Sequence, residues 1–282
     1  MGEAPVWFIT GAASGFGNEI AAQALRRGAR VVATAREPSR IAVSGENVLT
    51  LALDVTDRAA IDAAVREAEA RFGAIDVLVN NAGYGLIAAV EEATQAEIDQ
   101  LIRTHFTGTL DLIRAVLPGM RERRRGHVVN FSSIAGFTGG GGTALYAAAK
   151  FAVEGLSEGL AKEVAPLGIK VTIVEPGPFQ TQFFTGSRKM GVRQIADYDA
   201  TAGAYRRRAG KPDPWLPGDP ARGAQAITEI VAMADPPLRL LLGAFAYETA
   251  LKAYASRIDE AERWRDLSLS ADRPDAAGRE WP

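Results

Sequence analysis

Two residues that can move a proton, a tyrosine and a lysine, lie four positions apart at Tyr146 and Lys150. In a helix, this spacing places both side chains on one face. A phenol has an unperturbed pKa of about 10, and a neighbouring ammonium lowers that pKa because it favours the phenolate. Such a tyrosine can pass a proton to or from a substrate oxygen. The alternative interpretation is a surface helix whose tyrosine and lysine share a face by chance.

Ser133 adds a third polar group to this candidate site. It follows the strand-like run His127–Ser132, and a loop with four successive glycines, Gly139–Gly142, leads from it towards Tyr146. The Ser133 hydroxyl can donate a hydrogen bond to the oxygen that Tyr146 would protonate.

A glycine-rich turn between a strand and a helix begins the elements that must position these residues. The apolar run Val6–Thr10 predicts a buried strand, and the sequence T-G-A-A-S-G-F-G occupies Thr10–Gly17. Apolar residues at helical spacing follow, and Gly28 ends that pattern. Backbone N–H groups at the start of such a helix bind a pyrophosphate, and glycine lets the phosphates approach the main chain. The turn therefore predicts a dinucleotide site.

The second predicted strand, Arg30–Arg36, ends in a basic residue. NAD-binding folds usually place an acidic residue near this point, where it holds the ribose hydroxyls. This chain has Ala35 and Arg36 there, and an arginine can pair with the 2′-phosphate of NADP. A solvated arginine is the alternative, but the missing acid favours NADP(H) over NAD(H).

Strands and helices alternate over most of the remaining chain. Further strands are predicted at 47–54, 76–83, 127–132, 170–175 and 238–242, and helices at 57–72, 94–120, 146–164 and from 219 onward. This alternation predicts an α/β fold, a Rossmann-like, doubly wound and mainly parallel sheet of about seven strands with helices on both faces. No internal boundary or repeat is visible, so residues 1–282 are predicted to form a single NAD(P)-binding domain.

The candidate site residues all fall at the carboxyl ends of the predicted strands, where ligands bind in open parallel sheets. They are Gly11–Gly17, Arg36, Asp54, Asn80, Ser133 and Glu175–Thr181. This convergence predicts a nucleotide site with chemistry beside it.

The regular pattern is lost between Gln182 and Pro217. Long irregular stretches inside a compact domain are usually functional, so this segment is predicted to form a substrate-binding insertion. Its aromatic residues and one methionine favour a lipophilic substrate, although they could instead anchor the loop: Phe183, Phe184, Met190, Tyr198, Tyr205 and Trp215. A helical extension is predicted from about residue 244, followed by a tail from Arg273 that contains proline and arginine.

Composition excludes several functional classes. Hydrophobic residues make up 47% of the 282 residues and charged residues 23%, as in globular proteins with a substantial core. The net charge of −2 gives no global attraction to nucleic acid or to an anionic membrane. There is no cysteine, which rules out disulfides and thiol chemistry. No metal site and no membrane span are expected, and a cytoplasmic enzyme is the default expectation.

With these residues placed, the chain resembles the short-chain dehydrogenase/reductase family from Val6 to about Leu242. The motifs that carry the resemblance are T-G-A-A-S-G-F-G, Asp54-Val55, N-N-A-G at Asn80–Gly83, Ser133, Y-A-A-A-K at Tyr146–Lys150 and P-G-P-F-Q-T at Pro176–Thr181. Ser133 precedes Tyr146 by 146 − 133 = 13 positions, the usual offset in that family.

The resemblance implies a role for each matching residue. Tyr146 would be the general acid/base, Lys150 would contact the nicotinamide ribose, and Ser133 would contact the substrate oxygen. Together with the glycine-rich turn and Arg36 argued above, the candidate cofactor-binding residues are Gly11, Ser14, Gly15, Phe16, Gly17, Arg36, Asp54, Val55, Asn80, Ala82, Gly83, Tyr146, Lys150, Pro176, Gly177 and Thr181.

One position departs from the family pattern. An asparagine is usual in the long fourth helix, in a V-N-x-x-G setting, and this chain has T-H-F-T-G with His105 in its place. His105 is therefore a candidate fourth catalytic residue that relays a proton or holds water, and a packed helix histidine is the alternative. Because histidine titrates near pH 6.5, the first interpretation predicts an extra pH dependence of the rate at about pH 6–7.

These motifs predict an NADP(H)-dependent oxidoreductase that interconverts a ketone or aldehyde and an alcohol, on a lipophilic small molecule. The resemblance also implies a homodimer or homotetramer. An alternative from another class is a regulatory protein that senses NADP(H) with little turnover, but such a sensor would need neither Ser133, Tyr146 nor Lys150.

Overall fold

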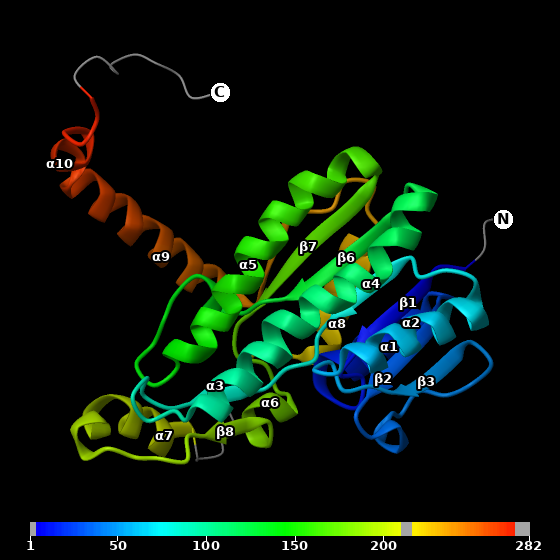
Figure 1. The fold of residues 1–282 in the computed structure, drawn as a ribbon, viewed down its shortest axis with the longest axis horizontal. Coiled ribbons are helices and arrows are strands. Elements are labelled where there is room, and N and C mark those ends of the chain that lie inside the picture. The colour runs from blue at the N-terminus through cyan, green and yellow to red at the C-terminus, as the bar shows by residue number, and fades with distance from the viewer. Residues whose placement is uncertain (1–3, 210–215, 274–282) are drawn as a thin grey trace.

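The computed structural model describes residues 4–209 and 216–273. Seven parallel strands form one sheet in the order β3-β2-β1-β4-β6-β7-β9 (Figure 1). Neighbouring strands are in parallel register throughout, for example Thr10 with Thr34 and Asn80 with Asn130. All seven strands therefore end at the same edge. This arrangement confirms the predicted Rossmann-like α/β fold.

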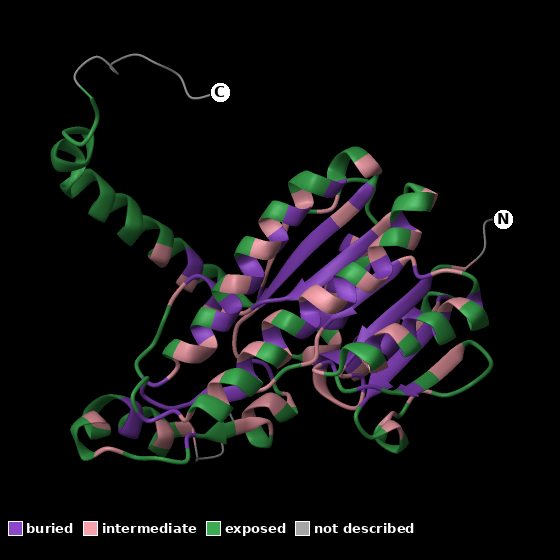
Figure 2. Ribbon diagram, in the orientation of Figure 1, coloured by how far each residue is buried: buried purple, intermediate pink, exposed green. Residues whose placement is uncertain are grey.

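Helices cover both faces of the sheet, and each face has its own apolar core. On one face, Phe8, Leu78 and Val128 pack against α2, α4 and α5. On the other, Ile9 and Val79 pack against α1 and α8. Figure 2 shows the inner strands β1, β2, β4, β6 and β7 largely buried between these layers. Burial on both faces explains why the central strands β1 and β4 are nearly continuous apolar runs, whereas the edge strand β3 is partly exposed.

The elements lie close to their predicted positions. The strands are β1 Val6–Thr10, β2 Arg30–Ala35, β3 Val48–Ala52, β4 Val77–Asn80, β5 Gly85–Ile87, β6 Gly126–Phe131, β7 Ile169–Pro176, β8 Arg188–Met190 and β9 Arg239–Leu242. The helices are α1 Gly15–Arg26, α2 Arg58–Phe72, α3 Gln95–Ile102, α4 Gly108–Arg123, α5 Ala144–Val164, α6 Gln182–Thr185, α7 Ala204–Ala209, α8 Pro220–Val231, α9 Ala244–Arg263 and α10 Arg265–Leu269.

Two regions differ from the sequence-based expectation. The long helix predicted from Thr94 to Met120 is α3 and α4 joined by a π-helical turn, Arg103–Thr107, which the apolar spacing did not reveal. The segment predicted to be irregular contains α6, β8 and α7, and β8 pairs in parallel with β5 as a small second sheet. These elements lie beyond one edge of the main sheet (Figure 1).

The predicted C-terminal helices are α9 and α10, and Figure 2 shows α9 leaving the body with most of its length exposed. Trp215 and the tail beyond Arg273 lie outside the described residues. Among residues 4–209 and 216–273, no helix is long and apolar enough to cross a membrane.

Candidate active site

The turn between β1 and α1 has the shape that a bound pyrophosphate needs. Gly11 and Gly15 have left-handed backbone angles, with φ of 68° and 54°. A Cβ on Gly17 would lie 2.3 Å from the Gly11 carbonyl oxygen, so only glycine fits there. Ser14 makes no capping hydrogen bond through its side chain, and the first turn of α1 carries no acidic residue. The turn can therefore receive an anion, and the residues fit a dinucleotide cofactor.

The residues predicted to hold the adenosine half lie at the ends of β2 and β3. Arg36 is exposed directly after β2. Asp54 is exposed two residues after β3, where its Oδ1 accepts hydrogen bonds from the Thr56 amide and hydroxyl at 2.9 and 2.8 Å. Val55 is buried, and its carbonyl approaches the start of α4 so closely that a Cβ on Gly108 would lie 2.5 Å from it.

Hydrogen bonds from asparagine side chains connect the strands and helix in the middle of the site. Asn80 Nδ2 donates to Asn130 Oδ1 at 2.8 Å, and Asn130 Nδ2 donates to Ser157 Oγ at 2.8 Å. Asn81 Nδ2 donates to the Thr10 carbonyl at 2.9 Å. The asparagines of the N-N-A-G motif thus tie β4 to β6, α5 and β1.

Strand β6 and helix α5 bring Ser133, Tyr146 and Lys150 together. Ser133 lies two residues after β6, and its Oγ accepts a hydrogen bond from the Ala135 amide at 3.1 Å. Tyr146 is in the first turn of α5, and the Lys150 ammonium lies 5.7 Å from the centroid of its ring. Lys150 Nζ also donates to the Phe131 carbonyl at 2.7 Å, which fixes the ammonium at the end of β6.

Burial controls the protonation of both groups. It raises the pKa of the Tyr146 phenol, while hydrogen bonding with Ser133 acts in the opposite direction. It also lowers the pKa of Lys150 to about 7, against the carboxylate of Glu154, which acts to raise it. The sequence-based expectation of a lowered tyrosine pKa is therefore wrong for this state of the protein. The phenol stays protonated and is suited to donate a proton.

His105 lies in the π-helical turn, only 2% exposed, and contacts both Tyr84 and Tyr146. Its Nε2 is 2.7 Å from the Tyr84 carbonyl oxygen, and its ring meets that of Tyr146 edge-on with centroids 5.5 Å apart. A Cβ on Gly83 would lie 2.5 Å from His105 Cε1. The glycine of N-N-A-G thus leaves room for the imidazole beside Tyr146.

The expected titration of His105 near pH 6–7 is contradicted. Burial, together with the charge of Lys150, lowers the pKa of His105 well below 6.5. The histidine is therefore neutral across that range. Its observed contacts are a hydrogen bond to the main chain and packing against Tyr146.

We expect His105→Asn to leave the pH dependence of turnover unchanged between about pH 6 and 7, because the wild-type imidazole does not titrate there. His105→Ala should melt at a lower temperature and turn over more slowly, because it leaves a cavity beside Tyr146. Rate–pH profiles and thermal melting of the three proteins check both statements. A wild-type inflection near pH 6.5 that His105→Asn abolishes would contradict them.

Aromatic rings form the wall beside Tyr146. The centroid of the Phe183 ring, on α6, lies 5.8 Å from that of Tyr146, and Phe184 lies 5.4 Å from Phe183. The Lys189 ammonium lies 4.6 Å from the centroid of the Tyr84 ring. The side of the site that faces α6 is therefore aromatic, and β8 adds a cation beside it.

Glu92 fastens the segment Arg188–Ala209, here called the lid segment, to the body. Its carboxylate is completely buried, accepts hydrogen bonds from the Ala89 and Ile195 amides at 2.8 and 2.9 Å, and pairs with Arg206. The Arg206 guanidinium holds the pKa of Glu92 at about 2.

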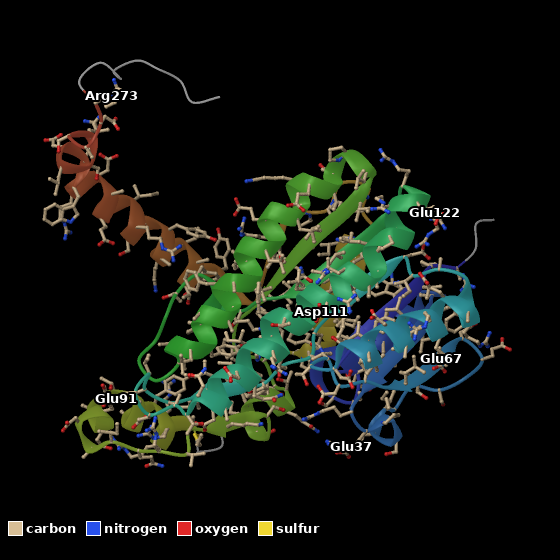
Figure 3. The ribbon with its side chains drawn as sticks, viewed as in Figure 1. Glu37, Glu67, Glu91, Asp111, Glu122 and Arg273 are labelled. Atoms are coloured by element: carbon tan, nitrogen blue, oxygen red, sulfur yellow. The ribbon has the colours of Figure 1, made fainter. Side chains whose placement is uncertain are left out.

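Glu91, labelled in Figure 3, lies beside the lid segment and accepts a hydrogen bond from the Tyr198 hydroxyl at 2.8 Å. Glu92 and Arg206 are 114 positions apart, and sequence reasoning missed both because no local signal links them. Within the described ranges, no group of three or more possible ligands could hold a metal ion.

Comparison with known proteins agrees with this geometry. The family described as short chain dehydrogenase matches residues 5–191. The chain is 38% identical over 272 residues to oxidoreductase BOA17 from Botryotinia fuckeliana, which covers 94% of this chain and 98% of that relative. It is 40% identical over 239 residues to 3-ketodihydrosphingosine reductase from Bacteroides thetaiotaomicron, with 83% and 86% covered.

Solved structures agree as well. A short-chain dehydrogenase from Streptomyces avermitilis superposes with a TM-score of 0.88 at 41% identity, covering 96% of this chain and 100% of that one. A short chain dehydrogenase from Burkholderia cenocepacia in complex with NADP has a TM-score of 0.73 at 26% identity, covering 93% and 97%. The chain therefore belongs to the short-chain dehydrogenase/reductase family and is an NAD(P)-dependent oxidoreductase.

Proposed function

We propose that the protein is an NADP(H)-dependent reductase of lipophilic ketones or aldehydes. The observation that carries this proposal is the position of Tyr146, which is hydrogen-bonded with Ser133, lies with its ring centroid 5.7 Å from the Lys150 ammonium and packs against the Phe183 ring. Such a group can protonate a carbonyl oxygen inside an apolar site.

The residues of this chain would divide the reaction among them. A bound nicotinamide cofactor supplies hydride to the carbonyl carbon. Tyr146 donates its phenolic proton to the carbonyl oxygen, while the Ser133 hydroxyl donates a hydrogen bond to the same oxygen. Lys150, held by the Phe131 carbonyl, contributes the positive charge that stabilises the tyrosine oxygen once its proton has left.

Two relatives support a ketone as substrate. One is named 3-ketodihydrosphingosine reductase. The other is 3-oxoacyl-[acyl-carrier-protein] reductase FabG from Escherichia coli, which is 35% identical over 234 residues and covers 82% of this chain. Both names describe the reduction of a keto group. The apolar wall formed by Phe183 and Phe184 suits a substrate with a hydrophobic body.

The test is a screen of NADPH oxidation over lipophilic ketones and aldehydes, with NADH in parallel and the Tyr146→Phe variant as the blank. At least one carbonyl compound should be reduced by the wild type and not by the variant. Binding of NADPH without oxidation by any member of a broad panel would overturn the proposal and support a cofactor sensor.

Arg36 should set the preference for NADPH. A charge-assisted hydrogen bond to the 2′-phosphate is worth about 1.5–3 kcal/mol, which is about ten- to a hundred-fold in affinity. We expect Arg36→Ala to lose that factor for NADPH and little for NADH. Titration of both cofactors checks this, with Arg40→Ala as the matched control because Arg40 is also an exposed arginine after β2. A wild type that binds NADH more tightly would contradict it.

A further inference from the structure

Two buried carboxylates lie outside the residues assigned to proton transfer, and one of them is a helical turn beyond Lys150. Glu154 follows Lys150 by four residues on α5, so the two side chains share a helix face. Glu175 lies near the end of β7, directly before the Pro176-Gly177 pair. Glu154 is 8% exposed and Glu175 only 1%. Both line a pocket of about 460 Å³ whose other walls include Phe137 and Tyr254.

The guanidinium of Arg239 forms ion pairs with both carboxylates. Arg239 Nε lies 3.3 Å from Glu154 Oε2 and 3.6 Å from Glu175 Oε1, and Arg239 Nη2 lies 2.9 Å from Glu158 Oε2. Among the described residues, neither oxygen of Glu175 has a hydrogen-bond partner, and nor does Glu154 Oε1. Two buried anions beside one shared cation repel each other, and holding a proton removes one of the charges.

Other charged or titratable groups face the pair from each packed element. Helix α5 contributes Lys150 and Glu158, β9 contributes Arg239, and α9 contributes Tyr254 and Arg257. Arg257 donates to the Phe137 carbonyl and lies over the Phe151 ring at 5.8 Å, so its charge is engaged at the rim of the pocket.

We propose that Glu154 and Glu175 share one proton, and that the negative charge left on Glu154 favours the ammonium form of Lys150. Glu154 is then a positioning residue that acts through Lys150. Burial and the neighbouring Glu154 carboxylate raise the pKa of Glu175 to about 8, so Glu175 carries the proton at neutral pH. Glu154 opposes the burial that lowers the pKa of Lys150 to about 7.

The shared proton can be observed without turnover. Infrared difference spectra recorded from about pH 6 to about pH 10 should show a protonated-carboxyl band in the wild type that disappears near pH 8. The band should be missing from Glu175→Gln and unchanged in Glu158→Gln. Glu158 is the matched control because it also pairs with Arg239 but is half exposed. If wild type and Glu175→Gln have the same spectra, no proton is shared and the proposal fails.

The pH profile of carbonyl reduction tests whether Glu154 favours the charged form of Lys150. This experiment rests on the proposed function. Reduction needs the charged lysine, so kcat/KM should fall as pH rises through the pKa of Lys150. Removing a nearby carboxylate lowers that pKa further, and the alkaline limb should move to lower pH by about one unit. Glu154→Gln alone should shift the alkaline limb by less. Glu175 then has no carboxylate beside it, so Glu175 ionises and supplies the negative charge that Glu154 supplied.

The double variant Glu154→Gln/Glu175→Gln should therefore show the full shift, while Glu175→Gln and Glu158→Gln keep the wild-type limb. This non-additivity is the signature of a shared proton. A limb in the double variant that coincides with the wild type would overturn the link to Lys150. If the double variant does not fold, the single variants decide. An alkaline limb of kcat/KM in Glu154→Gln that coincides with the limb of Glu158→Gln would overturn the link to Lys150. If the protein reduced no carbonyl compound, the proposed function would be wrong, but the infrared measurement of the shared proton would still be valid. The two proposals are therefore tested independently.

Discussion

Replacing Tyr146 by phenylalanine should lower kcat for carbonyl reduction by about 10²- to 10⁴-fold. The variant loses the phenolic proton that the carbonyl oxygen must receive, and no other group takes its place. The ring itself should stay in position, because it is packed against His105 with centroids 5.5 Å apart and against Phe183 at 5.8 Å. Steady-state rates with a substrate from the screen measure the loss.

The same variant should bind NADPH almost as tightly as the wild type, which a fluorescence titration can show. Preserved binding separates a lost proton donor from a collapsed site. Turnover of Tyr146→Phe within a few-fold of the wild type would remove the phenol from the mechanism.

Lys150→Ala should impair both chemistry and cofactor binding. The ammonium is assigned contact with the nicotinamide ribose, and losing one charge-assisted hydrogen bond weakens affinity about ten- to a hundred-fold. Turnover at saturating NADPH should fall as well, because the tyrosine oxygen loses its neighbouring positive charge. Cofactor titration and single-turnover rates measure the two effects independently.

The control for Lys150→Ala is Lys150→Met, which keeps most of the side-chain volume. Lys150 is only 6% exposed and bonds to the Phe131 carbonyl, so the alanine variant also loses packing. If the charge matters, both variants should bind NADPH weakly, although the methionine variant melts at a higher temperature. Wild-type affinity and rate in Lys150→Met would show that the ammonium has no role.

The grouping of Ser133, Tyr146 and Lys150 could be predicted from the sequence because its signals are local. Tyr146 and Lys150 are one helical turn apart, and the glycines of the first turn mark a strand-to-helix junction wherever they occur. The carboxyl ends of parallel strands lie at one edge of the sheet. Ser133 and Asn80 could therefore be placed near each other from the sequence alone.

Long-range contacts and burial were beyond the sequence. Glu154, Glu175 and Arg239 lie on three separate elements, α5, β7 and β9, and come together only in the fold. Nothing in their sequence spacing links them. For His105 the predicted titration near pH 6–7 is wrong, because an unperturbed pKa carries no information about burial. The elements β5 and β8 were missed for a related reason. Each is three residues long, and they form a sheet only with each other.

Glu92 also restrains the lid segment. Lifting Arg188–Ala209 from the body would separate Arg206 and the Ile195 amide from a completely buried carboxylate. Leaving a buried charge without its partner costs about 3–5 kcal/mol. Any rearrangement of this segment must therefore keep Glu92 paired or admit water to its carboxylate.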